Sequence, residues 1–286
     1  MIVLLAIGRP NYGNFAYNLA VSIKAFNKVP IQLIYEDSAI SHLDNLRPFD
    51  KTTKIKPEHC RHANGKLYPA KAKLMIPKYC AYDEAIYLDV DSVCLKNFDA
   101  LISDLRRRDN NFYLTEVNGA ISGGGGTHWA KERTILEHYK LQQGLHIPAI
   151  NSSFVYFRKG EQLERLYDTA NELLHNPIPI GKHAERWGRS KEQPDELYMN
   201  IALGVMGHNP SYRSPMFFRW HQSFQAKDLK EHHYFMGFFG TKETNHRSMY
   251  EYYDRHMTNI YRSFGGRHLW KIGNLMQDKF ITRQWS

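Results

Sequence analysis

Ala85-Ile86-Tyr87-Leu88-Asp89-Val90-Asp91 reads as four apolar residues followed by two acids that flank a valine. The apolar run predicts a buried strand over residues 85–89. In an extended segment residues two apart point to the same side, so Asp89 and Asp91 are expected to face one way and Val90 the other. Such carboxylates repel each other unless a divalent cation neutralises them, and oxygen ligands suit Mg²⁺ or Mn²⁺. A diphosphate is the natural further ligand of that cation.

The chain on both sides of this stretch alternates between strand-like and helix-like patterns, which predicts an α/β fold with a mostly parallel sheet flanked by helices. In such sheets ligands bind beyond the carboxyl ends of the strands, where Gly8 and the acidic pair are expected. Pro77 is expected to kink or end its helix. The predicted strands are 2–8, 31–36, 85–89, 111–116 and 151–157, and the predicted helices are 14–27, 70–80, 97–108, 161–174 and 195–205.

The composition is that of a globular protein, with 286 residues, 42% of them hydrophobic and 23% charged. The net charge of +9 favours a polyanionic partner, such as a nucleic acid, a phosphorylated glycan or a nucleotide substrate. The three cysteines are odd in number and widely spaced, which gives neither a disulfide framework nor a zinc knuckle and favours a reducing, cytoplasmic location. No apolar run approaches the roughly 18 residues of a membrane span, so none is expected.

Five segments, taken in their order along the chain, resemble the GT-A-fold glycosyltransferases, closest to the glycogenin-like and lipopolysaccharide galactosyltransferase-like family (family 8). The resemblance covers about residues 1–245 and implies a Rossmann-like catalytic domain of that extent with a DXD motif. It further implies a hexosyl- or pentosyltransferase that uses Mn²⁺ or Mg²⁺ and a nucleotide-diphosphate sugar, a UDP-sugar in particular. The segments are Tyr68–Leu74, Tyr82–Ser92, Asn151–Phe157, Gln193–Asn200 and His233–Lys242.

The resemblance also implies roles for single residues. Asp91 would chelate the metal directly, and Asp89 would contact the metal or the ribose. The turn at Gly8 would admit the nucleobase, while Lys71 or Lys73 would pair with phosphate. His233 would be the third metal ligand, with His221 and His232 as rivals, and Lys242 would hold the diphosphate. The chain departs from the family where Ser153 replaces a glycine and where Pro194-Asp195 replaces Asp-Gln.

The acceptor side offers several polar candidates. An inverting enzyme needs a carboxylate base near the acceptor hydroxyl, whereas a retaining enzyme needs only a nearby polar group. Asp195, Glu196, Asn151 and Glu116 are the candidates for these catalytic roles. Asp195 also fits the N-cap of the helix predicted at 195–205, and Asn151 fits a turn at a strand edge.

From residue 206 onward the chain is basic and aromatic, with twelve Lys or Arg, six Asp or Glu and seven His. Residues 246–286 are expected to form a basic aromatic helical extension packed on the catalytic domain. Arg255, Arg262 and Arg267 also fit a polyanion surface, so the acceptor is expected to be a glycan or a nucleic acid, a modified DNA base included. The rival hypotheses are a nucleotidyltransferase and a nucleic-acid-binding protein without catalysis.

Overall fold

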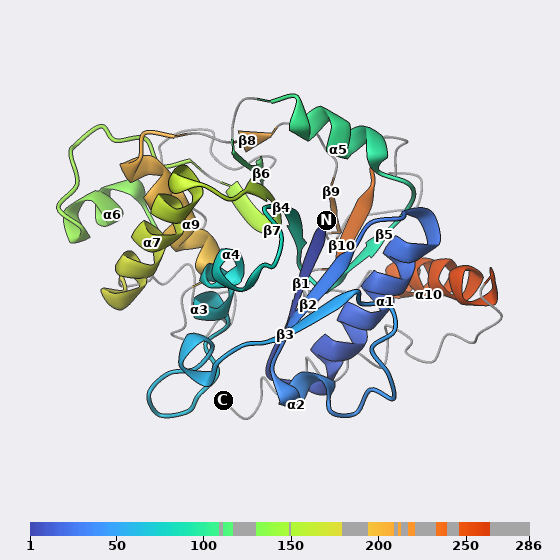
Figure 1. Cartoon of the computed structure of the whole chain (residues 1–286). Coiled ribbons are helices and arrows are strands. Elements are labelled where there is room, and N and C mark those ends of the chain that lie inside the picture. Colours follow the sequence, from blue (N-terminus) through green and yellow to red (C-terminus); the bar gives the residue numbers. More distant parts are fainter. Residues whose placement is uncertain are drawn as a thin grey trace. The chain divides into compact units, whose positions relative to one another are not determined.

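The computed structural model describes residues 1–108, 111–116, 130–148, 150–178, 194–208, 211–212, 217–220, 233–238 and 246–263. It is a mixed α/β fold in which most strand pairs are parallel, so the predicted fold class is confirmed (Figure 1). The described residues fall into two compact units. Unit 1 contains Met1–Lys54, Leu88–Arg108 and the described residues from 217 onward, and unit 2 contains Ile55–Tyr87 and the described residues between Asp109 and Arg213.

Unit 1 begins with three parallel strands in the order β3-β2-β1. β1 (Ile2–Ala6) is buried at all five positions, as expected of a strand covered on both faces, whereas β3 (Lys51–Lys54) is mostly exposed. β2 (Ile31–Tyr35) lies between them. Helix α1 (Pro10–Phe26) packs against the short helix α2 (Asp37–Ile40). Gly13 permits this approach, because a Cβ there would lie 2.0 Å from the Ala39 carbonyl oxygen.

A second, three-stranded sheet in unit 1 has β10 (Phe235–Phe238) at its centre. β5 (Ser92–Cys94) pairs with it antiparallel, and β9 (Phe217–Trp220) pairs with it parallel. Helix α5 (Asp99–Arg106) follows β5, and the long helix α10 (His246–Ser263) packs on α1 (Figure 1). Asn18 on α1 donates to Tyr253 Oη at 2.8 Å and accepts from Tyr261 Oη at 2.9 Å. The proposed boundary at residue 245 stays a prediction.

Unit 2 has strands in the order β4-β7-β6-β8. β6 (Phe112–Glu116) runs antiparallel to β7 (Ile150–Arg158) and parallel to β8 (Ser211–Tyr212), while β4 spans Glu84–Leu88. The antiparallel pair departs from the run of parallel β-α-β units that the alternation predicts. Between Leu114 and Thr115 of β6, the partner on β7 changes from Val155 to Asn151, so β7 bulges.

The helices of unit 2 confirm the predicted break near Pro77. α3 (Pro69–Leu74) ends before α4 (Ile76–Tyr79), in which the proline occupies the first turn. A single 3₁₀ turn, Pro57–His59, precedes them. Helices α7 (Glu161–His175) and α9 (Asp195–Val205) pack on each other, and α9 also packs on β7. Helix α6 (Glu132–His138) contributes Ile135 to a core with Ile147, Ile178, Leu197 and Ile201.

Among the described helices, none combines the length and the apolar character that crossing a bilayer requires.

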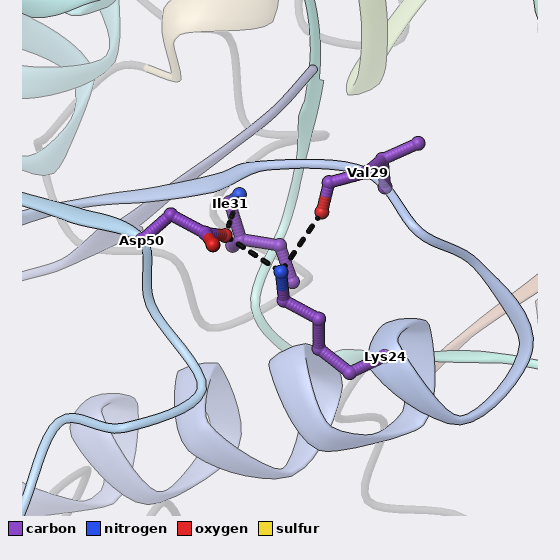
Figure 2. Close-up of polar contacts among 4 residues, drawn as sticks. All are labelled: Lys24, Val29, Ile31 and Asp50. Carbon is purple, nitrogen blue, oxygen red and sulfur yellow. Dashed lines mark hydrogen bonds and ion pairs between the residues drawn. The ribbon is translucent and has the colours of Figure 1, made fainter.

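Figure 2 shows how the end of α1 is tied to the start of β2. Lys24 Nζ donates to Asp50 Oδ2 at 2.7 Å and to Val29 O at 3.1 Å, and the same Asp50 oxygen accepts from Ile31 N at 2.7 Å. Burial raises the pKa of Asp50, but the hydrogen bonds from Lys24 and Ile31, together with the Lys24 charge, lower this pKa on balance. The ionised carboxylate is therefore the form that stabilises unit 1.

Replacing Asp50 by asparagine is expected to lower the free energy of unfolding by about 0.5 kcal/mol at pH 7, because both partners of this ion pair are partly exposed. The native pKa lies below the unfolded value of about 3.9, so the contribution is complete above that pH and is lost as pH falls through the native pKa. Urea titrations of parent and variant should converge at low pH. Asp44→Asn, at an exposed carboxylate, is the control, and a difference that persists unchanged to the lowest pH contradicts the prediction.

Candidate functional site

The acidic pair of unit 1 lies in the connection between β4 and β5, after Leu88 and before Ser92. Asp89 and Asp91 are half-buried, whereas Val90 between them is only 4% exposed. This pattern is the one expected when the two acids face away from the core on either side of an inward valine. Two carboxylates with partial access to water suit a hard cation such as Mg²⁺ or Mn²⁺ and leave further coordination positions for other oxygens. The residues therefore fit a divalent metal.

The strand register does not bring His233 to this pair. β10 runs antiparallel to β5 with Gly237 opposite Ser92 and Phe235 opposite Cys94, and Leu95 N donates to Tyr234 O. His233 therefore lies beyond the far end of β5, about 17 Å along the strand from Asp91 at the usual rise per residue. Its side chain is 6% exposed. The prediction that His233 is the third metal ligand is therefore wrong.

The turn after β1 is fixed by an acid that sequence reasoning did not single out. Gly8 has φ +83°, the left-handed region that glycine occupies without strain. Its N–H donates to Glu36 Oε2 at 3.0 Å, and Glu36 N donates to Ala6 O at 3.0 Å. The carboxyl ends of β1 and β2 are thereby joined, which gives Gly8 a fixed position in unit 1.

Unit 2 gathers a second set of candidates where β7 meets the start of α9. Asp195 and Glu196, in the first turn of α9, are 8% and 9% exposed. Ser152 Oγ donates to Asp195 Oδ2 at 2.6 Å, and Asn151 Nδ2 donates to Glu196 Oε2 at 3.0 Å. The bulge in β7 lets two consecutive residues reach the same helix, which a regular strand does not allow. The positive end of the helix dipole favours both acids here.

The N-cap interpretation of Asp195 is wrong, because Pro194 occupies the N-cap position and Asp195 is the first helical residue. Lys73 on α3 instead places its Nζ 3.7 Å from Asp195 Oδ2 and lies 5.8 Å from the centre of the Tyr87 ring. The two charged side chains are 21% and 12% exposed, so water screens this pair only weakly. We call Lys73, Asn151, Ser152, Asp195 and Glu196 the acidic cluster.

A tyrosine that no sequence signal indicated lies within reach of the charges of the acidic cluster. Burial raises the pKa of Tyr167 on α7, the negative charge of Asp195 raises it further, and the positive charge of Lys73 opposes this. Tyr198 on α9 is also kept neutral, because burial and a hydrogen bond with Tyr68 raise its pKa. Tyr167, the phenol on which the charges of Asp195 and Lys73 act, is therefore uncharged at neutral pH. Lys71 is not among the residues of the acidic cluster. Its charge helps to lower the pKa of His59, for which burial is the main cause.

Several predicted site residues cannot be placed. Lys242, His221 and His232 lie outside the described residues, as does Arg267. Glu116 ends β6, and its side chain is likewise not described. Within the part of the chain that the structure describes, no three His, Cys, Asp or Glu side chains gather closely enough to hold a metal ion. The acidic pair is thus the described portion of the candidate metal site.

Comparison with solved structures identifies the fold. The chain resembles the galactosyltransferase LgtC in complex with donor and acceptor sugar analogues, at a TM-score of 0.55 and 14% identity, over 92% of this chain and 96% of that one. An active-site mutant of LgtC gives a TM-score of 0.54 at 14% identity, with the same coverage. The bifunctional glycosyltransferase WbbM gives 0.54 at 12% identity, over 91% of this chain and 51% of that one.

No protein-family model and no curated protein matches the sequence. The likeness therefore rests on the course of the backbone, and it extends over nearly the whole of LgtC. It agrees with the α/β architecture and the predominance of parallel strands described above. The chain accordingly has the GT-A fold of these glycosyltransferases.

Proposed function

We propose that this protein is a metal-dependent glycosyltransferase that moves a sugar from a nucleotide-diphosphate sugar, a UDP-sugar in particular, to an acceptor hydroxyl. The observation that carries the proposal is the half-buried pair Asp89 and Asp91, which follows a buried strand in a chain of GT-A fold. The transfer breaks the bond between the sugar and the diphosphate. The negative charge left on the diphosphate is the main charge that such an enzyme has to stabilise.

Asp89 and Asp91 would hold the metal, Mn²⁺ or Mg²⁺, through their carboxylate oxygens. A bound divalent cation supplies neutralisation of the diphosphate charge as the bond to the sugar breaks. Gly8 would contact the nucleoside, since its turn lies at the carboxyl end of β1 in the same unit. Lys242 and Lys71 are proposed to pair with phosphate oxygens. Because His233 lies away from the acidic pair, the remaining metal positions would be filled by oxygens of the donor and of water.

We further propose that the residues of the acidic cluster act on the sugar during the transfer. The sugar passes through an oxocarbenium-like state that carries positive charge. Lys73 Nζ and Ser152 Oγ both contact Asp195 Oδ2, so this carboxyl group is fixed in position and would stabilise such a charge. Glu196 is oriented by Asn151 and would be the base for the acceptor hydroxyl if the enzyme inverts. The other end of the Asn151 amide is also hydrogen-bonded, because its Oδ1 accepts from Ser153 N at 3.0 Å.

A sugar hydroxyl is the acceptor that the observations favour. One structural neighbour was solved with an acceptor sugar analogue. On the described part of α10, Arg255 lies one helical turn after Glu251 and directly after Asp254 in the sequence, so this part of the predicted basic surface mixes both signs of charge. A mixed surface of this kind is ordinary for a solvated helix and does not indicate nucleic acid. We therefore propose a glycan acceptor.

The test is a panel of UDP-, GDP-, ADP- and CMP-linked sugars incubated with the full chain and Mn²⁺, with release of the nucleotide as the readout. Transfer to water is expected to release nucleotide from one or a few UDP-sugars, and simple glycosides added as acceptors are expected to accelerate it. Excess EDTA should abolish release, and Mn²⁺ added beyond the EDTA should restore it.

Two outcomes would count against the proposal. Release that is unaffected by EDTA would remove the role given to Asp89 and Asp91. Failure to bind or consume any sugar nucleotide, measured both by release and by protection against thermal unfolding, would remove the transferase activity itself.

A further inference from the structure

The strand that follows the acidic pair is held by side chains from two helices. Cys94, the last residue of β5, is fully buried, and its N–H donates to Ser22 Oγ of α1 at 3.0 Å. Its carbonyl oxygen accepts from His256 Nε2 of α10 at 2.9 Å. Because a carbonyl only accepts, Nε2 of His256 carries the proton. The N–H and the carbonyl of Cys94, three residues after Asp91, are therefore both hydrogen-bonded to side chains of helices that are distant in the sequence.

Ser22 and His256 make the hydrogen bonds that a neighbouring strand would otherwise make to β5. Successive residues of a strand direct their backbone groups to opposite edges, and Leu95 N donates to Tyr234 O on the β10 side. The groups of Cys94 therefore point to the other edge of β5, which is the edge of the three-stranded sheet. Buried backbone groups are almost always paired, and here α1 and α10 supply the partners.

α10 is held on unit 1 at two separate places. The ring of His256 is stacked with the rings of Phe26 and Tyr252, at interplanar angles of 21° and 10°. Burial lowers the pKa of His256, and this effect outweighs the hydrogen bond to Cys94, which raises the pKa. The ring is therefore neutral near pH 7. The other anchor consists of Tyr253 and Tyr261, which bond to Asn18. The first anchor contacts β5 through the bond to the Cys94 carbonyl.

We propose that His256 is a positioning residue for the metal-binding pair Asp89 and Asp91 and acts through the Cys94 carbonyl. This inference rests on the proposed function, in which that pair holds the metal. β5 has only three residues, so a displacement of Cys94 moves the segment that carries Asp91 directly. Helix α10 is then part of what makes the metal site, because it fixes one end of the strand that orients the site.

The experiment measures Mn²⁺ binding to the full chain by titration calorimetry, together with hydrogen exchange of residues 88–95 without metal. His256→Phe keeps an aromatic ring but no donor, and its Kd for Mn²⁺ should rise about tenfold, as is common when outer-shell partners of metal ligands are removed. Exchange of residues 88–95 should accelerate in the same variant. His256→Gln restores an N–H at similar reach, and both readouts should return close to those of the parent.

Tyr261→Phe is the matched control, because it removes a hydrogen bond of the other α10 anchor and leaves the bond to Cys94 in place. Its Mn²⁺ affinity and its exchange at residues 88–95 should equal those of the parent. If it weakens Mn²⁺ binding as much as His256→Phe does, docking of α10 in general is responsible and the proposal for His256 is overturned. The same follows if the parent binds Mn²⁺ and His256→Phe binds it equally well. If the parent binds no Mn²⁺, the metal assignment fails, and this proposal fails with it.

Discussion

Replacing Asp91 by alanine is expected to reduce nucleotide release from the donor by at least about 100-fold, since the loss of even an outer-shell partner of a metal ligand costs 10- to 100-fold. The physical reason is that one carboxylate, Asp89, remains to hold a divalent cation against water. The diphosphate charge is then neutralised less well as the sugar leaves. Initial rates with the preferred UDP-sugar, measured over a range of Mn²⁺ concentrations, check the prediction. Part of the loss should be recovered at high Mn²⁺.

The variant should remain folded, because Asp91 is half-buried in a connection and lies outside the buried strands. The melting temperature should therefore stay within a few degrees of that of the parent. Asp44→Ala removes an exposed carboxylate elsewhere in unit 1 and controls for the change in net charge. A variant that folds and releases nucleotide at the parental rate would falsify the assignment of the metal site.

Local sequence pattern predicts the elements of this fold well, but not how they pair. The strand predicted at 2–8 is β1 (Ile2–Ala6), and the strand predicted at 151–157 is β7 (Ile150–Arg158). The break near Pro77 is also found where the proline chemistry requires one. The antiparallel pairing of β6 with β7 was not predicted, because the apolar pattern of a strand is the same in either direction. Direction depends on the connection and on the distant strands it joins.

The candidate site shows the same limit. The triplet at residues 89–91 is readable because its alternation and its place after a buried strand are local properties. The family resemblance implies His233 as a ligand from the order of the motifs, whereas its distance from Asp91 is set by the register of β10 against β5. The Pro194-Asp195 pattern suggested a cap, yet Asp195 bonds to Ser152 through a bulge that no local pattern reveals. Tyr167 carries no sequence signal, since only folding brings α7 to the acidic cluster.

Replacing Asp195 by asparagine is expected to lower kcat about 100-fold or more while KM for the donor changes only a few-fold. A fixed anion stabilises the positive charge of the sugar only as that charge develops, so its loss falls on the transition state. The near-isosteric amide keeps an oxygen that can accept from Ser152 Oγ, so the contact with β7 is largely retained. Steady-state kinetics with the preferred donor and acceptor separate the two parameters.

A purely structural role for Asp195 makes a different prediction, and Asn200 provides the comparison. Its side chain accepts from Ile150 N at 3.2 Å and donates to Ile150 O at 3.4 Å, which ties α9 to β7 through neutral hydrogen bonds and without the carboxylate of Asp195. Asn200→Ala should lower the free energy of unfolding by about 1–3 kcal/mol, because it leaves buried backbone groups unpaired, with little change in kcat at a temperature where the variant is folded. Asp195→Asn should show the opposite balance, a large loss of kcat with a smaller loss of stability. If the two variants instead lose kcat in proportion to their loss of stability, Asp195 only anchors the helix, and the charge on the sugar must be stabilised by another group.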